Sequence, residues 1–171
     1  MSRPASAAPT LPAGRARAAA LVLLAALGAA IAGYLTAVHY TGAAALCTGV
    51  GGCEQVQASR FAVAAGVPVA LWGLGLYLGL LALAAWRAAA GPRTPPLARL
   101  ALFALALAGA LYSAYLTYLE LFVIGAICPW CVASAVVITA LWALATLDLL
   151  GGEPARGSAP TGAEPAVGRP S

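Results

Sequence analysis

The stretch CPWCVASAVVITALWALATLDL, residues 128–149, decides the fold. It joins a C-x-x-C pair to an apolar run whose one charged residue, Asp148, lies near the far end. Pro129 suits the first position of a helix, where a backbone N–H has no partner within the helix. A helix needs about 20 apolar residues to cross a hydrocarbon core. Residues 129–149 are therefore predicted to form a transmembrane helix that begins at the cysteine pair.

Three stretches upstream are equally long and apolar, namely 18–38, 68–88 and 97–122. In the whole chain 63% of residues are hydrophobic and 8% are charged, whereas soluble domains carry roughly 25% charged residues. The first stretch is longer than the apolar core of a signal peptide, which has about 7 to 15 residues. We therefore expect it to remain in the protein as a transmembrane helix and not to be cleaved. The sequence predicts an all-α integral membrane protein with a bundle of four transmembrane helices.

The two ends of the chain have a different composition. Residues 1–14 and 151–171 are rich in Pro, Ala, Gly and Ser and show no apolar periodicity. Such segments bury too little apolar surface to offset the entropy of ordering. We expect two disordered tails on either side of one membrane domain, residues 15–150.

The arginines predict the orientation. The net charge is +4 without a single lysine, and the arginines lie in tails and connectors rather than on one face, so no nucleic-acid partner is expected. Arginine is enriched on the cytoplasmic side of membrane proteins. All but one fall at the ends that would share that side: Arg3, Arg15, Arg17, Arg87, Arg93, Arg99, Arg156 and Arg169. Both termini are therefore predicted to be cytoplasmic, in the plasma (inner) membrane, with segments 39–67 and 124–128 on the opposite side.

Those two extracytoplasmic segments hold all four cysteines, in the compartment where disulfides form and persist. Cys47 and Cys53 are separated by Thr-Gly-Val-Gly-Gly, whose glycines let the backbone close a small ring and move. The start of a helix favours a thiolate at Cys128. Cys131 lies one turn later, roughly 4.5 Å deeper.

A mobile pair, Cys47 and Cys53, above a fixed pair, Cys128 and Cys131, predicts that electrons pass from one pair to the other. Thiol-disulfide exchange proceeds through mixed disulfides, so electrons would pass from an external protein to Cys47, through a Cys53–Cys128 bond, to Cys131 and into the bilayer. The alternatives are two inert disulfide staples or one zinc site. The five-residue spacer between Cys47 and Cys53 is longer than the usual two to four of zinc sites, so no metal is expected.

These residues resemble the vitamin K epoxide reductase family over about residues 18–150. The resemblance lies in Cys47, Cys53, Ser59-Arg60-Phe61 in the same loop, and Cys128-Pro129-Trp130-Cys131. Membrane oxidases of the DsbB type have their C-x-x-C in the first extracytoplasmic segment instead. The resemblance implies a four-helix bundle around a quinone, menaquinone or ubiquinone, with Cys131 beside the quinone and Cys128 as its partner. It also implies that Cys53 bridges to Cys128 and that Cys47 meets the external substrate.

The resemblance points to further quinone contacts. Ser59 corresponds to the family's loop serine, which would hydrogen-bond a cysteine or a quinone oxygen, or else cap a loop helix. Trp130 lies within the C-x-x-C and is a second candidate contact. A short helix over residues 54–66 would cover the quinone site.

The chain departs from the vertebrate members at two positions. Ala135 replaces a tyrosine, and an apolar stretch around Val69 replaces an asparagine. The resemblance is therefore closer to the bacterial branch, which oxidises a DsbA-type thioredoxin-fold protein. The tail after residue 150 is too short for such a domain, so the partner is expected to be separate. The rival functions are a membrane scaffold with structural disulfides and a thiol reductase working in the opposite direction.

Three other polar residues lie in or near the apolar stretches. His39, at the outer end of the first, is expected to be an ordinary interfacial histidine, although histidine is a residue type that often donates or accepts protons in proteins. Glu120 and Asp148 lie near helix ends, and we expect both to reach toward water.

Overall fold

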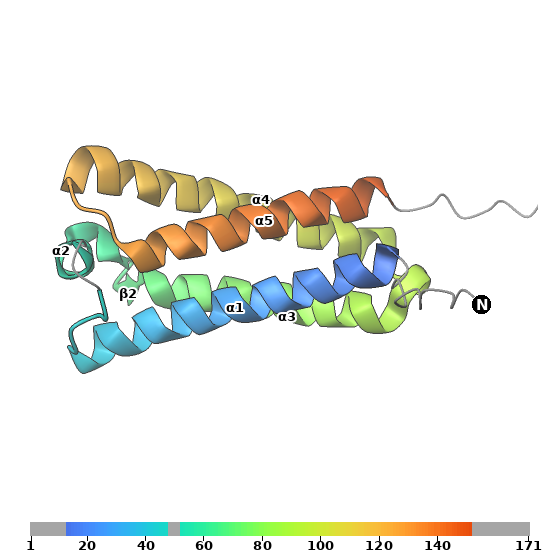
Figure 1. Ribbon diagram of the computed structural model, residues 1–171, viewed down its shortest axis with the longest axis horizontal. Coiled ribbons are helices and arrows are strands. Elements are labelled where there is room, and N and C mark those ends of the chain that lie inside the picture. The colour runs from blue at the N-terminus through green and yellow to red at the C-terminus, as the bar shows by residue number, and fades with distance from the viewer. Residues whose placement is uncertain (1–12, 48–51, 152–171) are drawn as a thin grey trace, which may run out of the picture.

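The computed structural model describes residues 13–47 and 52–151, which form an elongated bundle of long helices (Figure 1). Four of these helices are long and apolar enough to cross a membrane. Their bounds are α1 Ala13–Thr41, α3 Val69–Ala90, α4 Pro96–Leu119 and α5 Pro129–Leu150. Each predicted stretch coincides with one of them, which confirms the all-α membrane class. α1 begins inside the predicted tail of residues 1–14, and the rest of both predicted tails, apart from Gly151, lies outside the described residues.

Small and branched side chains let the helices pack closely. α1 lies along α3 and α5, α4 lies along α5, and α3 and α4 contact each other less closely. The centre of the core contains Leu21, Leu80 and Leu141, all nearly inaccessible. A Cβ at Gly109 would collide with side chains of α3 and α5, so this glycine allows α4 to approach them.

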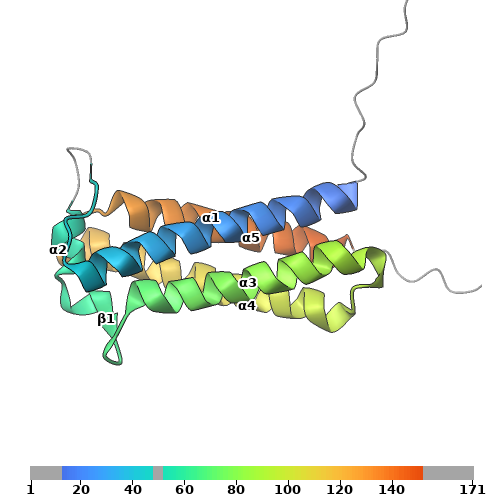
Figure 2. The same cartoon turned by 90° about the horizontal axis from the view of Figure 1, so that it is seen from below.

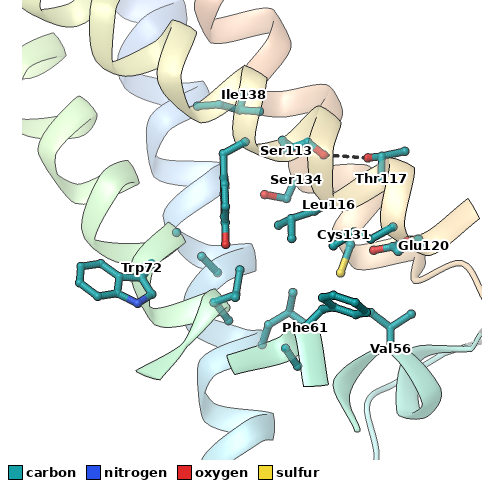
Figure 3. Close-up of a pocket in the computed structure, with 18 of the residues that line it drawn as sticks. Val56, Phe61, Trp72, Ser113, Leu116, Thr117, Glu120, Cys131, Ser134 and Ile138 are labelled. Carbon is teal, nitrogen blue, oxygen red and sulfur yellow. Dashed lines mark hydrogen bonds between the residues drawn. The ribbon is translucent and has the colours of Figure 1, made fainter. Parts of the chain in front are cut away.

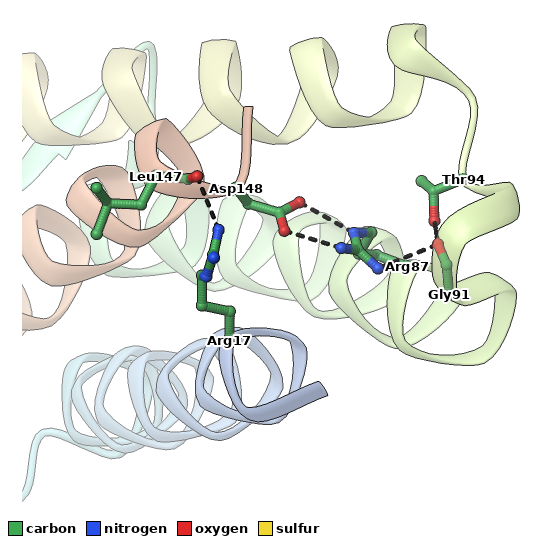
Figure 4. A network of polar contacts seen from close by, with 6 residues as sticks. All are labelled: Arg17, Arg87, Gly91, Thr94, Leu147 and Asp148. Atoms are coloured by element: carbon green, nitrogen blue, oxygen red, sulfur yellow. Dashed lines mark hydrogen bonds and ion pairs between the residues drawn. The ribbon is translucent and has the colours of Figure 1, made fainter. Parts of the chain in front are cut away.

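A buried ion pair closes one end of the bundle (Figure 4). Arg87 donates from Nε and Nη2 to the two carboxylate oxygens of Asp148, each at 2.9 Å. Their side chains are only 11% and 5% exposed. Arg17 of α1 donates to the Leu147 carbonyl at 3.0 Å, so three helices meet here. The expectation that Asp148 reaches toward water is wrong, because an arginine on α3 neutralises it inside the bundle.

The two ends of the bundle differ in chemistry. The start of α1, the connector between α3 and α4, and the end of α5 lie together at one end, while α2 and the start of α5 lie at the other (Figures 1 and 2). Five of the six arginines among the described residues lie at the first end, and the cysteines, together with Arg60, lie at the second. This arrangement fits the predicted topology, although the side of the membrane that each end faces stays a prediction from arginine bias.

The segment between α1 and α3 is folded but only partly helical. It contains the short helix α2 Cys53–Gln57 and the 3-10 turn η1 Arg60–Ala62. An antiparallel pair follows, β1 Val63–Ala64 with β2 Val67–Pro68. The single helix expected over residues 54–66 is therefore wrong in extent. Ala65 and Gly66 have φ values of 53° and 78°, which reverse the chain in a tight two-residue hairpin instead.

Candidate thiol-disulfide site and adjoining cavity

The four cysteines lie together at the end of the bundle that contains α2 and the start of α5, which we call the outer end after the predicted topology. Cys47 and Cys53 form a disulfide, and Cys128 and Cys131 are thiols. Cys53 and Cys128 are both 0% exposed and belong to one small buried cluster with Val56 and Ala126. Segments 75 residues apart in the chain thus place one cysteine of each pair in the same water-free contact region.

Gly52 brings the segment between α1 and α3, called the outer loop from here on, close to the turn that precedes α5. Its N–H donates to the Ile127 carbonyl at 3.1 Å. A Cβ on Gly52 would overlap the Ala126 side chain, so any other residue would push the loop away. The sequence suggested that the glycines give this loop freedom to move, but Gly52 allows a close approach. Residues 48–51 lie outside the described residues.

Cys128 is the N-cap residue of α5, directly before Pro129. Its carbonyl accepts the first helical bond, from Val132 N–H at 3.0 Å, and Pro129 occupies the first helical position. A hydrogen bond from the Cys131 thiol lowers the pKa of Cys128 to about 7, against the opposing effects of burial and of the nearby Glu120 charge. A large fraction of Cys128 is therefore thiolate near neutral pH, the form that attacks disulfides.

Trp130 and Tyr34 hold the loop beside Cys47. The Trp130 indole N–H donates to the Leu46 carbonyl at 3.0 Å, and the Leu46 N–H donates to the Tyr34 hydroxyl at 2.8 Å. The two rings pack with centroids 4.9 Å apart. Sequence reasoning missed Tyr34, and Trp130 is not among the residues that line the cavity described next. Its role as a quinone contact stays a prediction.

A cavity of about 320 Å³ lies under the outer loop between α3, α4 and α5 (Figure 3). Its walls are mostly apolar, and they include Leu35, Val56, Phe61, Leu76, Leu116 and Ile138. Cys131 lines the cavity, whereas Cys128 does not. The pair Cys128 and Cys131 therefore extends from the buried cluster that contains Cys53 to the wall of an apolar cavity.

Ser59 lies in the cavity wall, as does its neighbour Gln57. The Ser59 hydroxyl donates to the Val56 carbonyl at 2.7 Å, so its proton is engaged within the loop. Its predicted contact with a quinone oxygen stays a prediction. The Gln57 side-chain nitrogen is buried and has no hydrogen-bond partner in the described part of the chain, so it is a donor available to a ligand.

Glu120 also lines the cavity, which sequence reasoning did not anticipate. It is only 4% exposed, so the expectation that it reaches toward water is wrong. The chain leaves α4 through a π-helical turn, η3 Glu120–Ile124, that faces the start of α5. There the Glu120 Oε2 accepts the Cys128 N–H at 3.0 Å. The first N–H groups of a helix lack partners within it and attract anions, which accounts for the inward carboxyl.

His39 takes no part in this arrangement. It is half-buried near the end of α1 and does not line the cavity. Its ring packs edge-on against that of Tyr40, with the ring centroids 5.8 Å apart. Among residues 13–47 and 52–151, no group of three or more His, Cys, Asp or Glu side chains is placed to hold a metal ion.

Comparison with known families gives one match. The sequence model of the Vitamin K epoxide reductase family matches residues 19–146. The matched region runs from α1 into α5 and contains all four cysteines, the outer loop and the cavity. It covers well over half of the 171 residues.

Proposed function

The chain belongs to the vitamin K epoxide reductase family, and from this premise we propose that it oxidises a secreted thioredoxin-fold protein and reduces a membrane quinone. The partner is a separate protein of the DsbA type. The observation that carries the proposal is the shared burial of Cys53 and Cys128, combined with the position of Cys131 in the wall of an apolar cavity.

The outer disulfide receives electrons from the partner. A partner thiolate attacks Cys47 Sγ, the Cys47–Cys53 bond breaks, and Cys53 leaves as a thiolate. The second partner thiolate then attacks the first partner sulfur, which releases Cys47. The partner now carries a disulfide, and two electrons reside on Cys47 and Cys53.

The second exchange moves these electrons inward. Cys53 attacks Cys128 Sγ of a Cys128–Cys131 disulfide, and Cys131 leaves as a thiolate. Cys47 then attacks Cys53, which re-forms the outer disulfide and releases Cys128. The resulting pairing, an outer disulfide with an inner dithiol, is the one present in the structure. The burial of Cys53 against the Cys128 region supports this transfer because water is excluded from the exchanging sulfurs.

The cavity residues fit a quinone. The volume of about 320 Å³ lies within the range of roughly 300–1,000 Å³ typical of small-molecule sites. Its apolar walls suit a hydrophobic ring, and the unsatisfied Gln57 side-chain nitrogen suits a carbonyl oxygen. When bound, a menaquinone or ubiquinone supplies the acceptor for two electrons and two protons. The cavity residues proposed to hold it are Cys131, Gln57 and the predicted contact Ser59. The other predicted contact, Trp130, lies outside the cavity wall beside Leu46 and would act on the quinone only through its position between Cys128 and Cys131.

The proposed location is the plasma (inner) membrane, with both termini cytoplasmic and the cysteines extracytoplasmic. In this orientation the outer disulfide meets secreted proteins, and the cavity lies within the bilayer, where quinones dissolve. The separation of arginine and cysteine to opposite ends of the bundle supports it.

The test is quinone reduction by the purified protein in detergent, supplied with a reduced DsbA-type protein. Wild type is compared with Cys131→Ala and Cys47→Ala, and with Thr139→Ala as a matched control in α5 whose hydroxyl bonds only within its helix. The expected result is turnover in wild type and control and none in either cysteine variant, with quinone still bound by Cys47→Ala. Equal turnover in all four proteins would make the cysteines structural staples. Reduction of the partner by a quinol, without the forward reaction, would reverse the direction.

A further inference from the structure

The proposed reaction moves protons as well as electrons. Two thiols and one quinone become one disulfide and one hydroquinone, so the quinone oxygens must take up two protons as they receive two electrons. Cys131 lies in the wall of a chamber with mostly apolar sides. Charged groups are costly to form in such surroundings unless a partner takes up the proton. A proton acceptor beside the Cys131 sulfur is therefore required.

Most polar groups of the cavity cannot serve this purpose. The hydroxyls of Ser59, Tyr77 and Thr117 each donate to a backbone carbonyl, at 2.7 Å, 2.9 Å and 3.0 Å respectively. The amide of Gln57 neither gains nor loses a proton near neutral pH. Glu120 is the only carboxyl among the described residues that line the cavity.

Glu120 has the contacts that proton transfer needs. Its Oε2 is held by the Cys128 N–H at 3.0 Å, and its carboxyl lies next to the Cys131 thiol, as Figure 3 shows. One ion pair, between Arg87 and Asp148, occurs in the part of the chain that the structure describes, and it lies at the opposite end of the bundle. Glu120 thus has no paired cation there, and a proton from the thiol is the partner that would neutralise it.

We propose that Glu120 is the proton carrier of the site, taking the proton of the Cys131 thiol and giving it to an oxygen of the quinone in the cavity. The proposal rests on the proposed function. In the first step the Cys131 S–H bond breaks and the carboxylate becomes a carboxylic acid. In the second, the acid O–H bond breaks as the quinone oxygen is protonated. The two electrons pass to the quinone when the Cys128–Cys131 disulfide forms, and Glu120 returns to the carboxylate. The second proton of the hydroquinone comes from solvent, since a large fraction of Cys128 is already thiolate near neutral pH.

Two substitutions separate proton transfer from a merely structural role. Glu120→Gln keeps an oxygen that accepts the Cys128 N–H but cannot carry a proton, whereas Glu120→Leu removes both functions. General acid–base catalysis contributes about 10²–10⁴-fold. We expect Glu120→Gln to slow quinone reduction by about 100-fold or more. Its thermal unfolding, and the oxidation of the partner by the Cys47–Cys53 disulfide, should match wild type.

Glu54→Gln is the matched control, since Glu54 is an exposed carboxyl beside Cys53. It should leave quinone reduction within about twofold of wild type. If Glu120→Gln also stays within about threefold while Glu120→Leu fails, Glu120 only holds the start of α5, and the proposal is overturned.

An infrared difference spectrum tests the proton directly, without quinone or partner. The spectrum between the dithiol and disulfide states of Cys128 and Cys131, prepared with a chemical reductant, should contain carboxylate stretching bands. The Cys131 thiol proton that lies against the Glu120 carboxylate in the dithiol state is absent in the disulfide state. The carboxylate bands should persist in Glu54→Gln and vanish in Glu120→Gln. A wild-type spectrum without a carboxyl change would overturn the proposal, even if Glu120→Gln failed to fold. If the wild type does not reduce quinone, the proposed function fails, and the spectrum still decides whether Glu120 exchanges a proton with the thiols.

Discussion

Replacing Asp148 by asparagine tests whether the buried ion pair stabilises the bundle. The substitution keeps the size of the side chain and one oxygen acceptor but removes the negative charge. Arg87 would then keep its positive charge with its side chain only 11% exposed. Its remaining strong partner would be the Gly91 carbonyl, which Nη1 meets at 3.2 Å.

Removing one member of a buried ion pair costs about 3–5 kcal/mol, because the other charge stays buried without compensation. The asparagine oxygen and the Gly91 carbonyl offset part of this cost, so we expect about 3 kcal/mol. At roughly 1.4 kcal/mol per tenfold, this lowers the folding equilibrium constant by about 10²-fold. The double variant Arg87→Met/Asp148→Leu removes both charges and should recover most of the loss.

The assay is reversible unfolding in mixed detergent micelles, from which the free energy of unfolding is obtained for each variant. Arg93→Gln is the control, since Arg93 is an exposed arginine at the same end of the bundle and should change stability by less than about 0.5 kcal/mol. A loss below about 0.5 kcal/mol for Asp148→Asn would refute the view that this pair is desolvated. A double variant as unstable as the single one would show that packing rather than charge is responsible.

Three further predictions concern the outer end and the core. Because the pKa of Cys128 is lowered to about 7, its thiolate is lost as the pH falls through 7. Attack of the Cys128 thiolate on Cys53 of the Cys47–Cys53 disulfide, which is the reverse of the proposed transfer and starts from the pairing in the structure, can be followed by stopped-flow. It should slow below pH 7 and level off above about pH 8. Cys131→Ala removes the hydrogen bond that lowers the Cys128 pKa, so the pH at which the exchange rate is half its maximum should move upward. An unchanged pH midpoint would show that this hydrogen bond is not the cause of the lowered pKa. Trp130→Phe loses one hydrogen bond to the outer loop, which is worth about 0.5–1.5 kcal/mol. Amide hydrogen exchange in that loop should therefore accelerate about three- to tenfold. Exchange rates equal to those of wild type would argue against the contact. Gly28→Ala places a methyl group where the Tyr77 ring lies. Thermal unfolding should show that the free energy of unfolding falls by about 1–3 kcal/mol. An unchanged free energy of unfolding would mean that the ring moves aside without cost.

The membrane made much of the fold predictable. A transmembrane helix must be a continuous apolar run, so the four helices could be identified from sequence to within a few residues. The gathering of the cysteines at one end followed from the same reading, since an even number of crossings returns the chain to one side. The places of Cys128 directly before α5 and of Cys131 one turn into it depend on local helix geometry, which sequence patterns describe well. That Cys131 lines a cavity depends also on how the other helices and the loop pack around α5.

Contacts between distant segments were not predictable in this way. Glu120 and Asp148 were both expected to reach water, because sequence shows their distance from a helix end but not the group that faces them. Asp148 meets an arginine 61 positions away, and Glu120 meets the N–H of Cys128 across a π-helical turn. The hairpin at Ala65 and Gly66 was missed because a resemblance had suggested one helix there.

The central claim is that Cys53 and Cys128 exchange directly, and Cys47→Ala tests it. In quinone-containing membranes Cys53 should attack the Cys128–Cys131 disulfide, and without Cys47 only the reverse attack by Cys131 can break the new bond, so a fraction of the protein should hold it. Arg60 is exposed in the outer loop between Cys53 and α3, so a protease added outside cleaves there. In that fraction the two fragments should stay joined on a non-reducing gel and separate on reduction, whereas all fragments of Cys47→Ala/Cys53→Ala should be separate from the start. Complete separation of the Cys47→Ala fragments without reduction would contradict direct exchange between the two cysteine pairs.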